Sequence, residues 1–172
     1  MTTFDEELKC DRLLNEIKQR HQSRDVIDVD DEMTKVVIFT CGNALYAFYG
    51  AEIREIIPAS GIFWVPGLPE YLPGLINVRG DIESVIDIRH FLGIRKSEPE
   101  KCLVAMAIQG EFRSGILVDS IEDVVDIPLN SIKPPLATLG GVARDLVAGE
   151  FDHARGVITL LDVEKLAARL TP

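Results

Sequence analysis

The sequence predicts an all-β fold with short helices, and two observations support that prediction. Several short runs rich in β-branched and aromatic residues are separated by turn residues at near-regular spacing, which is typical of barrels and sandwiches rather than of a parallel α/β sheet. The same order of runs also occurs twice along the 172 residues, which indicates two copies of one small β-unit. Hydrophobic residues make up 47% of the chain, a content that excludes wholesale disorder.

Each copy begins with a predicted β-hairpin. The first extends from Val36 to Tyr49 around a turn at Cys41-Gly42-Asn43, and the second extends from Leu103 to Val118 around a turn at Gln109-Gly110-Glu111. Apolar runs on both sides of a short glycine-containing turn are typical of hairpins. We therefore expect two antiparallel strand pairs in corresponding places.

The similarity between the copies continues after the hairpins. It pairs residues 51–57 with 119–125 and residues 85–92 with 160–167. In the second pair an apolar strand ends at an aspartate, Asp87 or Asp162, whose carboxylate can accept from the first free N–H groups of a short helix. We infer that the copies join near residues 96–101 and that a helix from Asp162 to Leu170 closes the chain.

Residues 1–33 differ from the rest and are expected to form an acidic extension that is partly helical or disordered, before a domain at 34–172. A capping box begins a short amphipathic helix, whose apolar face carries Cys10, Leu13, Leu14 and Ile17. The acidic run at 28–32 is typical of a solvated linker. Two roles stay open for the helix: it packs on its own domain, or it docks a partner.

Charge and cysteine content narrow the class of protein. The net charge of −10, without a five-residue basic cluster, opposes binding to nucleic acid or to an anionic membrane. Three cysteines without a CxxC spacing are typical of reduced thiols in a cytosolic protein. No secretion signal opens the chain, and no apolar run approaches the roughly 18 residues of a spanning helix. We expect a cytoplasmic protein that does not insert into a membrane.

Catalytic and metal-binding patterns are missing from the sequence. The three histidines, His21, His90 and His153, lie far apart, and the cysteines do not have the spacing of a zinc site. The acidic runs lack the central glycine of an EF-hand loop. No nucleophile elbow, P-loop or dinucleotide fingerprint occurs. The sequence therefore predicts a protein that is not an enzyme.

The centre of the chain contains the most specific pattern. Gly74 precedes an apolar pair and Asn77-Val78-Arg79-Gly80, and an apolar strand then ends in Val85-Ile86-Asp87-Ile88-Arg89. This pattern resembles the CheW family, the coupling proteins of bacterial chemotaxis arrays, over about residues 34–170. The chain departs from the family at Ser84, where a proline is frequent, and in its longer N-terminal extension.

The resemblance implies two five-stranded β-barrels packed together. One barrel surface would bind the matching regulatory domain of a CheA-type histidine kinase. The cytoplasmic hairpin tip of a methyl-accepting chemotaxis receptor would dock nearby, so that the state of the receptor biases the activity of the kinase. Such an adaptor catalyses nothing and needs no cofactor.

The resemblance also indicates which residues bind the receptor or the kinase: Arg79, Glu55, Gly74, Ile53, Asn77 and Val78. Arg79 presents a planar donor fork suited to carboxylates or carbonyls on a partner helix, and its alternative role is an internal ion pair with Glu55. For Gly74 and Gly80 we expect backbone roles through positive φ or close approach. For Asn77 we expect a hydrogen bond within a turn.

Core packing is the simpler account of Ile53 and Val78, and Trp64 is expected in the core or between the barrels. Two other functions remain open. One is an adaptor in a kinase array that governs surface motility or development, which the N-terminal extension would select. The other is a sensor that binds a small ligand in the groove between the barrels.

Overall fold

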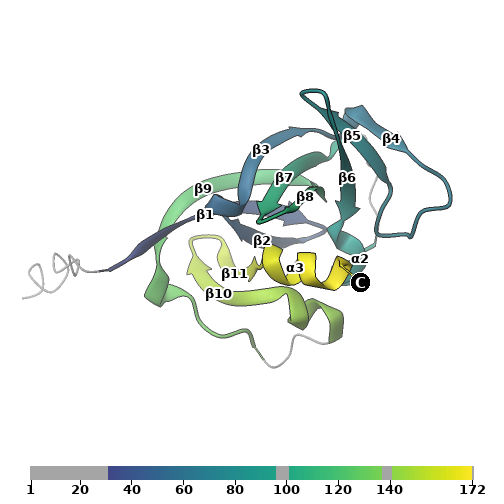
Figure 1. Ribbon diagram of the computed structural model, residues 1–172. Helices are drawn as coiled ribbons and strands as arrows, with labels where there is room; N and C mark the ends of the chain where they lie inside the picture. The colour runs from purple at the N-terminus through teal and green to yellow at the C-terminus, as the bar shows by residue number, and fades with distance from the viewer. Residues whose placement is uncertain (1–30, 96–100, 137–140, 172) are drawn as a thin grey trace, which may run out of the picture. The chain divides into compact units, whose positions relative to one another are not determined.

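The computed structural model describes residues 31–95, 101–136 and 141–171, and the helix expected around Cys10 to Ile17 lies outside them. The described residues form two β-sheets (Figure 1). The five-stranded sheet has the spatial order β10 (Val147–His153), β11 (Gly156–Leu161), β2 (Ala44–Tyr49), β1 (Met33–Cys41) and β9 (Ser120–Pro128). The six-stranded sheet has the order β3 (Ile53–Pro58), β7 (Leu103–Gln109), β8 (Phe112–Val118), β6 (Asp81–Asp87), β5 (Gly74–Val78) and β4 (Ile62–Trp64).

The predicted β fold with two subdomains is confirmed, and so are both hairpins. β1 pairs antiparallel with β2, and β7 pairs antiparallel with β8. The second sheet has six strands where five were expected, because the three-residue strand β4 pairs with β5 at its edge. Short 3-10 turns connect several strands: η1 (Gly50–Glu52), η2 (Ala59–Gly61), η4 (Leu129–Ser131) and η5 (Gly141–Leu146).

Both expected helix caps are present. Asp87 accepts a hydrogen bond from the Arg89 N–H at 3.1 Å and begins α2 (Ile88–Leu92). Asp162 accepts from the Lys165 N–H at 3.1 Å and begins α3 (Val163–Leu170). No helix within the described ranges is long and apolar enough to cross a membrane.

Strand register confirms the internal repeat. Ile56 of β3 lies opposite Ala105, and Val124 of β9 lies opposite Val37, which are corresponding positions in the two copies. β6 runs parallel to β8, as β11 runs parallel to β2.

The copies do not coincide with the sheets, which corrects the expectation that each copy forms a small β-unit of its own. β9 pairs with β1 of the other copy, and β3 pairs with β7 of the other copy. The chain crosses between the sheets at η1 and returns at Asp119. Tyr49 before η1 and Ile53 after it have extended backbone angles. The chain therefore runs from β2 through η1 directly into β3 of the six-stranded sheet. The six-stranded sheet is therefore one continuous segment, 53–118, inserted into the five-stranded sheet.

Apolar side chains form three clusters, two of which belong to the individual sheets. Successive side chains of β8 belong to different clusters, because neighbouring side chains of a strand point to opposite faces of the sheet. Leu117 packs in the cluster of the six-stranded sheet, whereas Ile116 and Val118 pack in the third cluster. This third cluster also contains Phe39 and Phe48 of the five-stranded sheet, so it joins the two subdomains.

A buried ion-pair cluster holds the return crossing at Asp119. The Asp119 N–H donates to the Thr40 carbonyl at 3.0 Å, and the Gly42 N–H donates to Asp119 Oδ2 at 2.7 Å. Arg89 is 2% exposed; its Nε lies 2.8 Å from Asp87 Oδ1 and its guanidinium 3.7 Å from Asp119 Oδ1. Cys41 is a buried free thiol beside this cluster. Burial first, and then the negative charge of Asp119, raises its pKa to about 12, so the thiol stays protonated.

Replacing Arg89 with Met should lower the free energy of unfolding by about 3–5 kcal/mol, because Asp87 would remain buried without its cation. Urea denaturation measures this change. Arg113→Met is the control, since Arg113 lies 3.2 Å from Glu83 but is 43% exposed, and pairs of that kind contribute about 0–1 kcal/mol. Equal losses in the two variants would contradict this account of the crossing.

Candidate protein-binding surface

The hairpin between β5 and β6 turns at Arg79-Gly80. Val78 pairs with Asp81, which leaves two residues in the turn. Arg79 has a φ of 54° and Gly80 a φ of 92°, and positive φ at both positions is typical of a type I′ turn. Asn77 Oδ1 accepts from the Gly80 N–H at 2.9 Å, as expected for a turn-stabilising asparagine.

Arg79 is the only non-glycine residue in the described part of the chain with a positive φ. A side chain in this left-handed region costs about 1–2 kcal/mol, and Asn or Gly is favoured at such a position. The local backbone therefore does not explain an arginine here, and the side chain is the remaining reason for it.

The Arg79 guanidinium reaches Glu55 on β3. Arg79 NH2 lies 3.3 Å from Glu55 Oε2, so the ion pair considered as the alternative role of Arg79 exists. The Arg79 side chain is nevertheless 75% exposed, against 21% for Glu55. Because the pair orients the guanidinium without burying it, most of its N–H donors stay open to a partner.

Four of the six predicted binding residues meet around one open hollow of about 320 Å³. It is lined by Glu55, Asn77, Val78 and Arg79 together with Ile57, Pro58, Ser60, Gly61 and Ile76. The lining combines the ion pair and the turn with apolar side chains of β3 and β5. Such a surface offers a partner both an apolar contact and an oriented cation.

The other two predicted residues lie away from this hollow. Ile53 is partly buried against the cluster that joins the subdomains. Gly74 is buried, and a Cβ there would lie 2.0 Å from the Phe63 carbonyl oxygen, so this glycine allows β4 to approach β5. Val78 lines the hollow but also packs against the core of the six-stranded sheet. Packing explains Ile53 and Gly74, so only the resemblance indicates that these two residues contact a partner.

The expected core position of Trp64 is wrong, because β4 is an edge strand. Only Ile62 of that strand is buried, while Phe63 is 68% and Trp64 is 53% exposed. Val65 and Leu68 follow with partial exposure. We call Phe63, Trp64, Val65 and Leu68 the β4 surface. Exposed aromatic and aliphatic side chains can mark protein interfaces; the signal in the sequence was an apolar run enclosed by turn residues.

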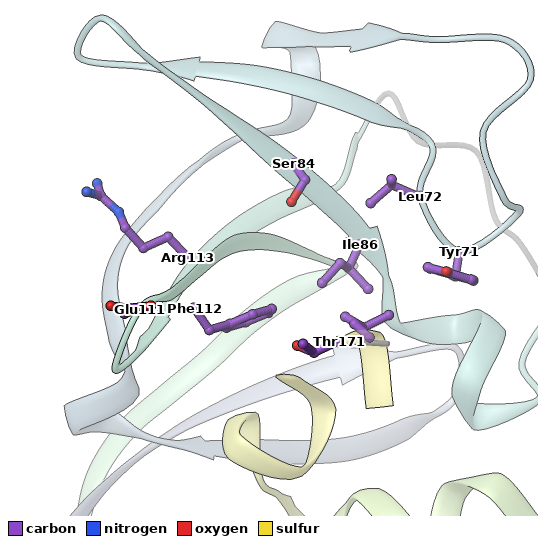
Figure 2. A pocket seen from close by; sticks show the side chains of 9 residues that line it. Tyr71, Leu72, Ser84, Ile86, Glu111, Phe112, Arg113 and Thr171 are labelled. Atoms are coloured by element: carbon purple, nitrogen blue, oxygen red, sulfur yellow. The ribbon is translucent and has the colours of Figure 1, made fainter. Parts of the chain in front are cut away.

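A larger hollow of about 480 Å³ lies beside the end of α3 (Figure 2). Figure 2 shows Ile86, Phe112 and Thr171 turned toward it, while Arg113 points away. Two of its hydroxyl groups already have partners: Ser84 bonds to Ser114, and Thr171 donates to a carbonyl of α3. Arg113, also in the lining, is paired with Glu83. Within the described ranges, no group of three or more His, Cys, Asp or Glu residues could hold a metal ion.

Arg79→Asn should stabilise the fold by about 0.5–1 kcal/mol, because Asn-Gly suits a type I′ turn and the exposed ion pair that is lost contributes less. Thermal unfolding measures the change. Arg155→Asn is the matched control. Arg155 lies in the turn between β10 and β11, is paired with Glu122 of β9 and does not have a positive φ. A loss of stability in Arg79→Asn would mean that the arginine serves the fold.

Comparison with known proteins identifies the family. The family model of the CheW-like domain matches residues 35–171. The chemotaxis protein CheW of Treponema pallidum is 23% identical, covering 85% of this chain and 89% of that protein. The chemotaxis protein CheW of Klebsiella aerogenes is 28% identical over 76% of this chain and 79% of that protein.

A solved structure agrees with these relatives. The crystal structure of the scaffolding protein TtCheW from Thermoanaerobacter tengcongensis superposes with a TM-score of 0.69 and 26% identity, covering 77% of this chain and 86% of the other. The residues that the family model matches include the Arg79 turn and all but the first two residues of the two sheets. The chain belongs to the CheW-like family of chemotaxis adaptor proteins.

Proposed function

We propose that this protein couples methyl-accepting chemoreceptors to a CheA-type histidine kinase in the cytoplasm, and that it acts by binding alone. The observation that carries the proposal is Arg79, which keeps an unfavourable backbone conformation while Glu55 orients its exposed guanidinium. Unfavourable conformations of this kind persist where the side chain is needed for function.

An adaptor needs two separate surfaces, and the six-stranded subdomain presents two of different chemistry. The Arg79 hollow offers a planar donor fork, which suits carboxylates and carbonyls at the end of a helical hairpin. We assign it to the receptor tip. The β4 surface offers exposed aromatic side chains, which suit the apolar centre of a stable interface. We assign it to the regulatory domain of the kinase.

The kinase surface is tested by calorimetric titration with the CheA-type kinase of the same cell. The wild type should bind in the micromolar range, roughly −8 kcal/mol. Trp64→Ala should weaken binding by at least about tenfold, because anchoring aromatics of an interface contribute about 2 kcal/mol or more. Val157→Ala is the control, since Val157 is 58% exposed on the five-stranded sheet. If the wild type does not bind, the coupling function is refuted.

The receptor surface is tested by kinase activity in reconstituted receptor–adaptor–kinase assemblies. Arg79→Glu reverses the charge next to Glu55 and should abolish the dependence of kinase activity on the receptor. Affinity for the kinase alone should stay within about twofold, since Arg79 lies outside the β4 surface. Loss of kinase affinity with intact receptor control would show that the two surfaces are assigned the wrong way round.

A further inference from the structure

A carboxylate lies at each of the two crossings between the sheets, and the charged groups around these two carboxylates differ. At the first crossing, η1 lies against the start of α3, where Glu52 accepts a hydrogen bond from the Val163 N–H. Glu52 Oε2 is buried and has no hydrogen-bond partner among the described residues. A buried carboxylate oxygen without a donor is unfavourable when the group is charged. Ionised Glu52 would therefore leave a buried, charged oxygen without a hydrogen bond from the described residues.

The return crossing has a compensating cation beside its carboxylate, which the first crossing lacks among the described residues. There Asp119 lies beside the start of α2, and Arg89 supplies the compensating cation. In the internal repeat, Arg89 corresponds to Glu164 of α3. Glu52 therefore lies near the carboxylates Asp162 and Glu164, whereas Asp119 at the return crossing lies near an arginine.

Two cations near the first crossing are engaged elsewhere. Lys165 donates to the Val147 carbonyl at 2.9 Å, and Lys35, whose stem lies against Gly50, pairs with Asp126 at 3.1 Å. Tyr49 precedes η1, and β3 follows it with Arg54, which is exposed, and Glu55, which pairs with Arg79. β7, which also contacts η1, carries no titratable residue.

We propose that the first crossing is a proton-sensitive joint, in which protonated Glu52 seats η1 on α3 and loss of that proton loosens the contact between the two subdomains. Protonation removes the charge that Asp162 and Glu164 repel, and it leaves the Val163 hydrogen bond in place. The joint is independent of any partner, because all of these groups belong to the described chain.

The titration of Glu52 agrees with this geometry. Burial, followed by the charge of Asp162, raises its pKa from 4.5 to about 7, although the Val163 N–H acts in the opposite direction. Because the pKa is higher in the folded state than in the unfolded state, the folded protein binds more protons between these two values. The stabilising contribution is complete below about pH 4.5 and is lost as the pH rises through about 7.

Direct observation of Glu52 in the full chain tests the joint. Carbon-detected NMR follows the Glu52 carboxyl between about pH 4 and 9, assigned by its absence in Glu52→Gln. We expect a midpoint within about one unit of 7, and amide exchange at Val163 should accelerate through the same midpoint beyond the general base-catalysed increase. A midpoint near 4.5, or exchange at Val163 that follows base catalysis alone, would overturn the proposal.

Two variants separate the joint from general effects of pH. In the wild type, the unfolding constant should rise by up to about tenfold per pH unit as Glu52 titrates, and Glu52→Gln should remove that rise. Glu164→Arg supplies the missing cation and should move the Glu52 midpoint downward, which remains measurable if Glu52→Gln does not fold. Glu111→Gln, at an exposed turn, is the control and should behave as the wild type. An unchanged pH dependence in Glu52→Gln refutes the joint.

Discussion

The structure depends on the pairing of strands from different copies of the repeat, β1 with β9 and β3 with β7. Neither sheet can form from one half of the chain, because each takes its hairpin from one copy and the following strands from the other. Folding therefore has to bring together residues far apart in sequence, which raises the entropic barrier to the first long-range contacts. In return, the chain crosses between the subdomains twice, and both crossings are anchored by buried or half-buried carboxylates.

This arrangement also positions the hollow beside Arg79. β3 emerges directly from the first crossing and carries Glu55 within a few residues of η1. The Arg79 turn joins β5 and β6 of the same sheet, and its ion pair with Glu55 connects it to β3 beside the hollow. A partner on this hollow would therefore contact the strand that directly follows the first crossing.

The features that the sequence predicts correctly are local ones. Hairpins and helix caps depend on residues that are close in sequence. Asp87 and Asp162 could therefore be recognised as helix caps without the structure. The exchange of strands was not visible, since an apolar run does not reveal which distant run it pairs with. Trp64 was placed wrongly for the same reason: an edge strand and a central strand have similar compositions.

The candidate site came from family resemblance more than from physical pattern. The resemblance indicated Arg79 and Glu55 as neighbours, and the structure adds the positive φ that makes the arginine conspicuous. Glu52 was missed, because its position against α3 depends on the strand exchange. A signal was nevertheless present in the repeat, where the position of Arg89 in one copy is occupied by Glu164 in the other.

If Arg79 is retained for a partner at the expense of the fold, its replacement should raise stability and remove coupling at the same time. Arg79→Asn and the wild type would be measured side by side for thermal stability and for receptor-dependent kinase activation in a reconstituted array. We expect the variant to be more stable than the wild type and to fail to transmit the state of the receptor. A variant that is more stable and couples as well as the wild type would contradict this expectation, because the arginine would then serve neither the fold nor the partner.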